Sequence, residues 1–586
     1  MTDISPTLGA PNLPAHPATT GRLHFADLRQ RSVETARSRL IWVVIGFVFF
    51  ALTAFARIGQ LGFGAAALAH DDGAAMAPPR AEITDRNGVP LARAFPGYAL
   101  RFNPEALGGS GSPLVKTPEE VARALVQIFP DLVYGVVLDK LKAGEATELR
   151  GRVLPEQANA VQALGEPALE FPIVPQRFYP QGSLAAHVIG YLEADKTGLH
   201  GKIGIEETLD ARLLDKARRA EPVALSLDAR AQGALEDELA RGIADTHATG
   251  GGGIVLDADN GEIIALASLP SFDPNRPDLA LNRLVFNRTS NQVYELGSTF
   301  KPFTIAAAID AGVVTDLAVR YPATPFKIAG RTISDSHNLG ASLNVPEALI
   351  HSSNIVTAQV ADKLGGQKLR DTMIALGMNT RPPIEISARG KPLWPQGDWS
   401  RLTTMTVSYG HGLSVTPLHL ATGYAALVNG GLWRPATLFK VDPAHVPEGR
   451  RVFQAATSAR MRQLLRLIVV DGTGKRADAA GFRVGGKTGS AEIAGAHGGA
   501  YRKNALIATF AAAFPMDRPR YVVIVMLDEP QGTEATSGQR TAAYNAAPIV
   551  GRLVPRIGPM LGVAPDRHRD IDVSDLTPLV ANGEGE

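Results

Sequence analysis

The hydrophobic positions of this chain form one continuous apolar run near the N-terminus, followed by a long remainder in which apolar and polar residues alternate. The run spans residues 40–56 and holds about 17 uncharged residues, near the lower limit for a membrane-spanning helix. Arginine is frequent in residues 22–39 and rare just after the run, a bias typical of a cytoplasmic N-terminus. We therefore predict a cytoplasmic tail at 1–39 and a single transmembrane anchor at 40–57.

A cleaved signal peptide is the alternative interpretation of the apolar run. Signal peptides normally have a short basic head and an apolar core of about 7–15 residues. The segment before this run is long, so an uncleaved anchor is favoured. No later segment of the sequence is apolar enough to span a membrane, and the remainder is expected outside it.

The region after the anchor is interpreted as a linker and then a mixed domain. Residues 58–79 are rich in Ala and Gly and end in two prolines, which is typical of a linker. Residues 80–92 indicate two short strands around an Asn-Gly turn, and residues 117–141 have helical periodicity behind an N-capping threonine. Residues 80–221 are therefore predicted to form a mixed α/β module, a spacer or partner-docking element without catalysis of its own.

A larger domain is expected at residues 222–562. An apolar hairpin pattern surrounds the Asp259-Asn260-Gly261 turn, and further strand patterns occur near the other end of the domain, before a closing helix at 541–561. The candidate strands are residues 254–257, 263–267, 482–486, 508–511 and 521–527. Strands at both ends with helical segments between them predict an α+β fold whose sheet pairs distant segments. The charged residues 563–586 are expected to form a mobile tail.

Composition narrows the chemistry. Lys plus Arg is 59 and Asp plus Glu is 58, so the charge balance gives no indication of a nucleic-acid partner. Cysteine is absent, which favours an exported protein without disulfides or thiolate sites. The thirteen histidines show no close metal-ligand spacing, and we expect neither a metal nor a cofactor.

The strongest chemical signal is Ser298, which has Lys301 three residues further on. If a helix begins here, this spacing places the hydroxyl and the amine on one face, within hydrogen-bond reach. A serine next to an amine that accepts its proton is the minimum requirement for nucleophilic catalysis. Lys301 would then need a lowered pKa, from burial or from a second cation. A helix N-terminus at Ser298 would also offer a backbone N–H to an oxyanion.

Two further motifs form a triplet with this pair. They are Ser352-Ser-Asn354 and Lys487-Thr488-Gly489, the latter followed by Ser490. Ser352 lies between two predicted helices, and Lys487 follows a predicted strand. Taken singly, a Ser-x-x-Lys pair is usually a helix cap with a surface lysine, and a Lys-Thr-Gly motif is usually a turn. Three such motifs in order make those interpretations much weaker.

Other matches to the two later motifs exist. Ser336-His-Asn338 and Ser342-Leu-Asn344 also fit Ser-x-Asn, and Lys196-Thr-Gly198 also fits Lys-Thr-Gly. The position between two predicted helices favours Ser352 and Asn354 over the other two Ser-x-Asn matches. Local context also favours Lys487 over Lys196, which lies between glycine-rich turns.

The triplet resembles the Ser-x-x-Lys, Ser-x-Asn and Lys-Thr-Gly motifs of penicillin-interacting serine enzymes. The similarity extends to class B penicillin-binding proteins over roughly residues 80–560. It is carried by residues 254–275, 294–304 and 409–417, and in the N-terminal module by Asp85–Gly88, Phe178–Pro180 and Gly204–Glu206. Residues 409–417 and 425–431 look most like the division-specific, septal peptidoglycan D,D-transpeptidases. Ser490 stands where threonine is commoner, and His411, which has no evident chemical role, replaces an often aromatic residue.

This resemblance implies a fold and a reaction. The fold would be a penicillin-binding transpeptidase domain, with an antiparallel sheet flanked by helices and an all-helical subdomain, behind an elongated pedestal at residues 80–221. Ser298 would attack the carbonyl between the two D-alanines of a peptidoglycan stem peptide. Lys301 would act as general base and Ser352 as proton relay, and Asn354 would hold Lys301 and the substrate amide.

The resemblance also assigns the substrate-binding strand. Lys487, Thr488 and Ser490, with Gly489 between them, would bind the terminal carboxylate. The backbone N–H groups of Ser298 and Ser490 would form the oxyanion hole. A β-lactam would mimic the dipeptide and leave Ser298 esterified.

Several other functions share part of this pattern. A β-lactamase has the triplet but is usually smaller and soluble, and a bifunctional synthase needs a glycosyltransferase domain for which residues 58–221 are too short. An elongation-type class B enzyme stays open, as does a non-catalytic penicillin-binding sensor or divisome scaffold. By resemblance, the partners would be stem peptides, β-lactams, a polytopic SEDS-family glycosyltransferase and other division proteins. The protein would sit in the inner membrane with its catalytic domain in the periplasm.

Overall fold

The computed structural model describes residues 42, 44–53, 79–106, 113–195, 198–282, 285–494 and 501–580. Residues 44–53 are helical. Within the described ranges, no helix is both long enough and apolar enough to cross a membrane. The rest of the predicted cytoplasmic tail, anchor and linker lies outside the described residues. Residues 78–586 form one compact unit.

The pedestal is organised around β2 (Pro90–Phe102), which pairs with four other strands. These are β1 (Ile83–Thr84), β3 (Thr147–Val153), β4 (Leu169–Glu170) and β5 (Ile173–Phe178), and a separate hairpin joins β6 (Leu192–Asp195) to β7 (Gly198–Gly201). The helices are α3 (Pro118–Ile128), α4 (Tyr134–Ala143), α5 (Pro155–Gln162), α6 (Ala186–Ile189), α7 (Gly204–Thr208) and α8 (Asp210–Leu214). The predicted strand pair around Asn87-Gly88 and the capping box at Thr117 are both confirmed.

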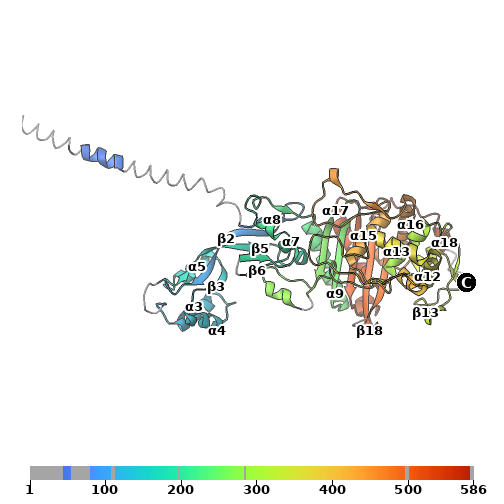
Figure 1. Ribbon diagram of the computed structural model, residues 1–586, viewed down its shortest axis with the longest axis horizontal. Helices are drawn as coiled ribbons and strands as arrows, with labels where there is room; N and C mark the ends of the chain where they lie inside the picture. The colour runs from blue at the N-terminus through green and yellow to red at the C-terminus, as the bar shows by residue number, and fades with distance from the viewer. Residues whose placement is uncertain are drawn as a thin grey trace, which may run out of the picture. The chain divides into compact units, whose positions relative to one another are not determined.

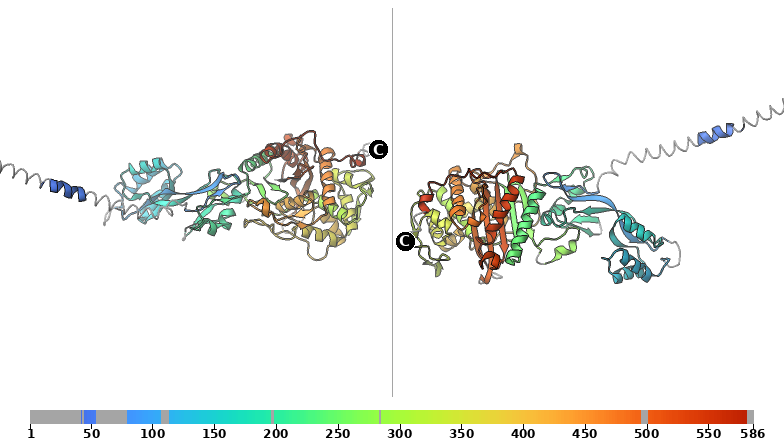
Figure 2. Two further views of the ribbon diagram at one scale, coloured as in Figure 1. Left: turned by 90° about the horizontal axis from the view of Figure 1, so that it is seen from above. Right: turned by 180° about the vertical axis from the view of Figure 1, so that it is seen from behind.

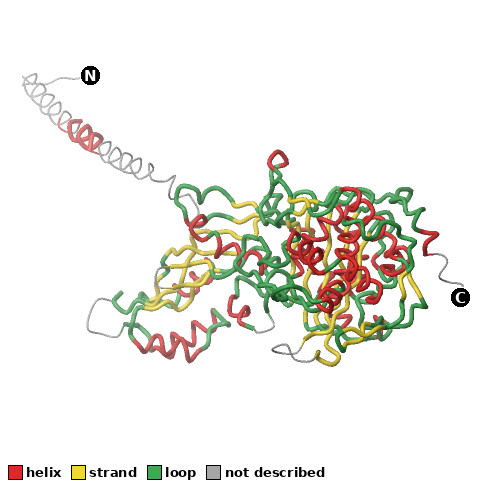
Figure 3. The backbone as a smooth tube through the Cα atoms, turned by 45° about the vertical axis from the view of Figure 1, so that its right-hand side comes forward, coloured by secondary structure: helices red, strands yellow, loops and turns green. Residues whose placement is uncertain are grey.

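The second domain is built on a five-stranded antiparallel sheet with the order β10-β9-β19-β18-β17. Its strands are β9 (Gly250–Asp257), β10 (Ile263–Leu269), β17 (Gly485–Ala494), β18 (Tyr501–Phe514) and β19 (Tyr521–Asp528). The sheet therefore pairs the two ends of the domain, as the sequence predicts. Figure 3 shows the strands gathered in this sheet and in that of the pedestal.

Helices cover both faces of this sheet (Figures 1 and 2). Side chains alternate along β9, so that Val255 packs beneath α9 (Ala229–Thr246) and α17 (Ala546–Met560), whereas Ile254 and Leu256 pack on the opposite side. Both sets of side chains are almost fully buried. The strand patterns are therefore continuous apolar runs, which are typical of a sheet covered on two faces.

The opposite face carries the helical region in which the serine motifs lie. Its helices are α10 (Lys301–Asp310), α11 (Val345–Ile350), α12 (Asn354–Leu364), α13 (Gly366–Ala375), α14 (Arg401–Ser408), α15 (Pro417–Val428) and α16 (Ala455–Asp471). Short strands between them are β11 (Tyr321–Pro322), β12 (Phe326–Ile328), β13 (Arg331–Ile333), β14 (Ser342–Leu343), β15 (Leu432–Trp433) and β16 (Arg450–Arg451). The α15 helix is buried along its whole length, so it forms the centre of this layer.

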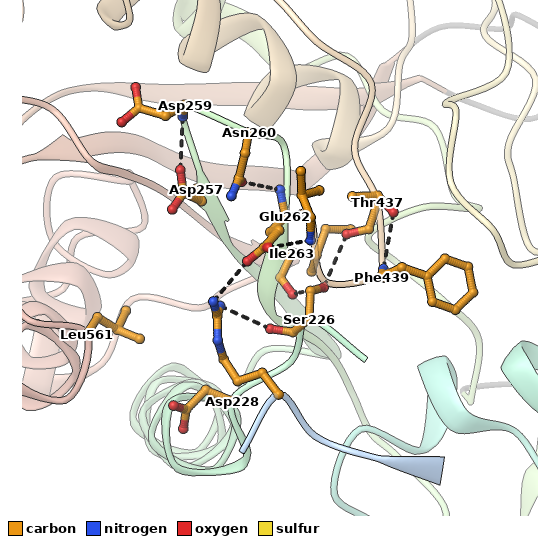
Figure 4. Close-up of polar contacts among 12 residues, drawn as sticks. Ser226, Asp228, Asp257, Asp259, Asn260, Glu262, Ile263, Thr437, Phe439 and Leu561 are labelled. Carbon is orange, nitrogen blue, oxygen red and sulfur yellow. Dashed lines mark hydrogen bonds and ion pairs between the residues drawn. The ribbon is translucent and has the colours of Figure 1, made fainter. Parts of the chain in front are cut away.

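A polar junction connects the pedestal to the second domain (Figure 4). The short strand β8 (Val223–Ala224) pairs with β1, and Ser226 then donates to the Ile263 carbonyl at 2.7 Å. Arg86 of the pedestal contacts Glu262 at 3.0 Å, next to the β9–β10 turn. The junction thus holds the first strand pair of the pedestal against the first hairpin of the sheet.

Two expectations need correction. The Lys-Thr-Gly motif does not follow a strand ending near residue 486, because β17 begins at Gly485 and contains the motif. The expected mobile tail also does not hold for residues 563–580, where Leu576 is 1% exposed and α18 (Thr577–Val580) contacts α11. Residues 581–586 lie outside the described ranges.

Candidate active site

Ser298 lies in a single 3₁₀ turn, η2 (Gly297–Phe300), directly before α10. The sequence predicted a helix starting at Ser298, and the α-helix itself begins at Lys301. In a 3₁₀ turn, side chains at i and i+3 eclipse one another, so Ser298 and Lys301 project from the same side. The turn is tied at its start by Gly297, whose N–H donates to the Gly410 carbonyl at 3.2 Å.

The turn also requires close backbone contact with its neighbours. Gly297 has a φ of +55° and Gly410 a φ of +82°, a region that favours glycine. A Cβ on Gly410 would lie 2.1 Å from the Gly297 carbonyl oxygen. The two glycines therefore allow the 409–412 segment to support the Ser298 turn directly.

Lys301 and Lys487 are both fully buried, and their amines meet at one hydroxyl. Lys487 Nζ donates to Ser352 Oγ at 2.9 Å, and Lys301 Nζ donates to the same oxygen at 3.1 Å and to the Ser352 carbonyl. The structure therefore brings one member of each of the three sequence motifs together. A neutral amine in either position can accept a proton from the Ser352 hydroxyl.

Burial changes the titration of both amines. It is the main cause that holds the pKa of Lys301 well below its ordinary value, followed by the positive charge of Lys487, while Asp335 acts in the opposite direction. Burial also lowers the pKa of Lys487 to about 7. Because the two amines share a partner, these pKa values belong to the pair. Both shifts favour the uncharged amine, which is the state that a general base requires.

Ser352 has a backbone conformation that is rare for a residue with a side chain. Its φ is +63°, in the left-handed region that costs about 1–3 kcal/mol for residues other than glycine. This conformation places Ser352 between α11 and the Ser353 N-cap of α12. Such strain is found where the surrounding contacts fix a functional side chain.

Asp335 makes several of the contacts that hold the loop containing Ser352. Its carboxylate accepts from Ser353 Oγ at 2.7 Å, from the Ile355 N–H at 3.2 Å and from the Asn354 N–H. An acceptor at a helix N-terminus satisfies donors that have no partner within the helix. Asp335 therefore holds the start of α12, and with it the loop that contains Ser352.

The side chain of Asn354 lies differently from the expectation that it holds Lys301. Its Nδ2 donates to the Ser334 carbonyl at 3.1 Å, and the contacts of Lys301 Nζ are to Ser352. The structure thus places Asn354 beside Ser352 without bringing its amide group to the lysine.

β17 is the last strand of the sheet, and its outer edge approaches the Ser298 turn. A Cβ on Gly489 would lie 2.5 Å from the Leu296 carbonyl oxygen, so only glycine permits this approach. Next to it, Thr488 Oγ1 lies 2.8 Å from Thr473 Oγ1, and Ser490 Oγ accepts from the Ala542 N–H at 3.1 Å. The strand presents two hydroxyls and the Lys487 amine beside the nucleophile turn.

The competing motif matches that the structure describes make other contacts. The Ser336 hydroxyl contacts the neighbouring His337 ring at 2.9 Å, and Asn344 caps the start of α11. Lys196 and Thr197 fall outside the described residues. No group of three or more His, Cys, Asp or Glu side chains in the described part of the chain is arranged to hold a metal ion.

Sequence reasoning missed three supporting residues. Asp335 has no motif signal, because it lies far upstream of the loop it caps. Thr473 lies in a glycine-flanked turn that carries no motif, and Gly410 belongs to the family-like stretch at residues 409–417 without a signal of its own. His411, which had no assigned role, has its Nδ1 3.2 Å from the carboxylate of Glu295, three residues before Ser298.

Comparisons with known proteins agree with this geometry. A family model for the penicillin-binding protein transpeptidase domain matches residues 251–551, and one for the penicillin-binding protein dimerisation domain matches residues 75–219. The chain is 37% identical to a probable peptidoglycan D,D-transpeptidase FtsI of Caulobacter vibrioides, with 92% of each chain covered. It is 29% identical to the peptidoglycan D,D-transpeptidase FtsI of Escherichia coli, covering 86% of this chain and 87% of that one.

A solved structure shows the same fold. Penicillin-binding protein 3 of Mycobacterium tuberculosis, crystallised with aztreonam, superposes with a TM-score of 0.64 at 24% identity. The match covers 84% of this chain and 98% of that chain.

Proposed function

Because the chain belongs to the class B penicillin-binding proteins and is a peptidoglycan D,D-transpeptidase, we propose that Ser298 is its nucleophile and that Lys301, Ser352 and Lys487 move the protons of acyl transfer. The observation that carries this assignment is the meeting of two buried amines of lowered pKa at the Ser352 hydroxyl, beside the Ser298 turn. Such a cluster is characteristic of an active site, since buried charges elsewhere in proteins are normally paired.

Acylation of the enzyme is the first half of the reaction. Ser298 Oγ attacks the carbonyl between the two terminal D-alanines, and its proton passes to neutral Lys301. The oxyanion that forms is held by the backbone N–H groups of Ser298 and Ser490, which the close approach of Gly489 to Leu296 supports. Ser352 passes a proton to the departing D-alanine amine, the C–N bond breaks, and an ester to Ser298 remains.

The second half of the reaction forms the cross-link. An amine on a neighbouring stem peptide loses a proton through the same Ser352–lysine pair and attacks the ester. The bond to Ser298 Oγ breaks, the serine regains its proton, and a new peptide bond joins the two stems. Lys487 and the hydroxyls of Thr488 and Ser490 bind the donor carboxylate along the free edge of β17. Asn354 holds the substrate amide from its position beside Ser352.

The physiological setting is a further part of this proposal. The FtsI relatives support a septal role in cell division. The helix at residues 44–53, whose Phe47 and Phe50 side chains are more than two-thirds exposed, supports an inner-membrane anchor at 40–57. The catalytic domain then faces the periplasm, where a SEDS-family glycosyltransferase and other division proteins are its partners. Membrane fractionation with periplasmic protease accessibility tests the anchor.

Labelling with a fluorescent penicillin tests the assignment of the nucleophile. We expect covalent label on the wild-type chain and on Ser336→Ala, and none on Ser298→Ala. Label that persists in Ser298→Ala would contradict the proposal, and rapid release of label would indicate a β-lactamase. Depletion in cells separates the septal role from the elongation role, because filaments support the first and rounded cells the second.

A further inference from the structure

The segment after α17 lies along α16 instead of leaving the domain. We call residues 564–580 the C-terminal strap. Three of its acidic residues contact one face of α16: Asp570 pairs with Arg466, the Asp572 carbonyl accepts from Gln463 at 2.7 Å, and Asp575 pairs with Arg460. The spacing of these α16 residues, three apart, places them on the same side of the helix. Leu576, 1% exposed, fixes the strap in the apolar core.

Arg466 connects the strap to the beginning of β17. Its side chain is 9% exposed and contacts both Asp570 oxygens, with N–O distances of 2.7–3.1 Å. The same guanidinium donates to the Val484 carbonyl at 2.8 Å, one residue before β17. A Cβ on Gly485 would lie 3.0 Å from the Arg466 backbone nitrogen, so the strand starts directly against α16. Lys487 is two residues further along this strand.

Asn344 connects the other end of the strap to the loop that contains Ser352. Its Nδ2 donates to the Leu579 carbonyl at 2.8 Å, and its Oδ1 accepts from the Glu347 N–H as the N-cap of α11. The α11 helix ends at Ile350, two residues before Ser352. The strap therefore contacts the start of α11 directly and the start of β17 through Arg466.

We propose that the C-terminal strap is a positioning element for acyl transfer, which through Arg466 and Asn344 fixes β17 and α11 relative to each other. The inference rests on the proposed function of Ser298, Lys301, Ser352 and Lys487. Lys487 and Ser352 come from segments far apart in sequence, and the 2.9 Å contact between them depends on how those segments are held. The strap acts through two contacts, that of Asp570 with Arg466 and that of the Leu579 carbonyl with Asn344.

Matched substitutions in the strap test this role in the full-length chain. Asp570→Ala removes one of the two carboxylate partners of Arg466 and leaves Asp478 in place, whereas Asp575→Ala removes a more exposed pair on the same helix that has no contact with β17. We expect the acylation rate constant with a fluorescent penicillin to fall about tenfold or more in Asp570→Ala, because a misplacement of about 1 Å can cost 10²-fold. Asp575→Ala should acylate like the wild type. Equal rates in the two variants, or equal losses, would overturn the proposal.

A second variant separates positioning from general destabilisation. Asn344→Asp keeps the acceptor that caps α11 but loses the donor to Leu579. It should slow the acylation step while leaving the dissociation constant of the initial penicillin complex unchanged, because α11 leads to Ser352 and not to the carboxylate site. Asp570→Ala should change both constants, since β17 binds the carboxylate. If both variants acylate normally while Ser298→Ala is inert, the strap proposal is refuted and the proposed function of Ser298 is kept. If the wild type itself is not acylated, the proposed function fails.

Discussion

Two of the places where the described residues bury charged side chains, the pedestal and the active site, hold charge in opposite ways. In the pedestal, Glu206 is fully buried and contacts Arg80 and Arg177, each at 2.7 Å. In the active site, Lys301 and Lys487 are equally buried, and within the described part of the chain no carboxylate forms an ion pair with either amine. A paired buried charge stays ionised and fixes local geometry. Two adjacent buried cations are driven toward the neutral form, in which one of them accepts protons.

The largest expected effect comes from removing the unpaired base. Lys301→Met should slow acylation by penicillin by about 10²–10⁴-fold, the usual contribution of a general base. The fold should persist, because the substitution also removes the desolvation cost of a buried amine. A stopped-flow acylation assay with thermal unfolding measures both effects. Lys363→Met, at an exposed position, is the control, and a Lys301→Met rate close to that of the wild type would contradict the assignment of the base.

Breaking the buried ion pairs of Glu206 should have the opposite effect: stability should fall and the acylation rate should be kept. Glu206→Gln leaves the two buried guanidiniums without their shared counter-charge, and breaking such a pair typically costs about 3–5 kcal/mol. We expect that loss in the free energy of unfolding of the pedestal by denaturant, with acylation unchanged well below the melting temperature. Glu193→Gln, which removes a pair more than half exposed, should change neither quantity. A strong loss of acylation in folded Glu206→Gln would show that this cluster takes part in catalysis.

The sequence predicts some elements of this fold better than others, for physical reasons. Apolar periodicity and turn residues predicted the β9–β10 hairpin, and strand patterns at both ends of the domain predicted a sheet that pairs distant segments. The three motifs singled out Lys301, Ser352 and Lys487, which the structure brings together, whereas the predicted role of Ser298 as nucleophile stays a prediction. The strand containing Lys487 was placed too early, because its Gly-Gly start interrupts the apolar run although the backbone continues into β17.

Individual side-chain contacts between distant segments were not predictable from the sequence. Asp335 carries no local signal, and its role depends on tertiary packing that brings it to the start of α12. The strap looked like a mobile tail because its composition is charged. Its acidic residues are nevertheless spaced to contact basic and polar residues on α16, and Leu576 is buried in the core.

The two lysines also predict a pH dependence of stability. The pKa of Lys487 is about 7 in the folded chain and near 10.5 when unfolded, so the unfolded state binds more protons between these values. Stability should therefore rise with pH across this window, by up to about 1.4 kcal/mol per pH unit, and the gain is lost as pH falls through the folded value. Denaturant unfolding from pH 7 to 9 measures it. The slope should be smaller in Lys487→Met, and an unchanged slope would refute the low pKa.

The smallest effect is expected from substitution of Asp335, which combines a structural role with an electrostatic one. Its carboxylate caps α12 and also opposes the loss of charge on Lys301. In Asp335→Asn one acceptor remains, so we expect the maximal acylation rate to fall only by roughly tenfold through a shift of Ser352. Removing the negative charge lowers the pKa of Lys301 further, so the acidic limb of the rate profile should move to lower pH. The other titratable groups near this site are Lys487, His337, His351 and Glu347. They are present in the wild type and in Asp335→Asn, so they affect the pH profile of both proteins equally. Asp335→Ala should lose more rate with the same shift in pH, whereas a fall in rate without any shift would mean that Asp335 acts only as a helix cap.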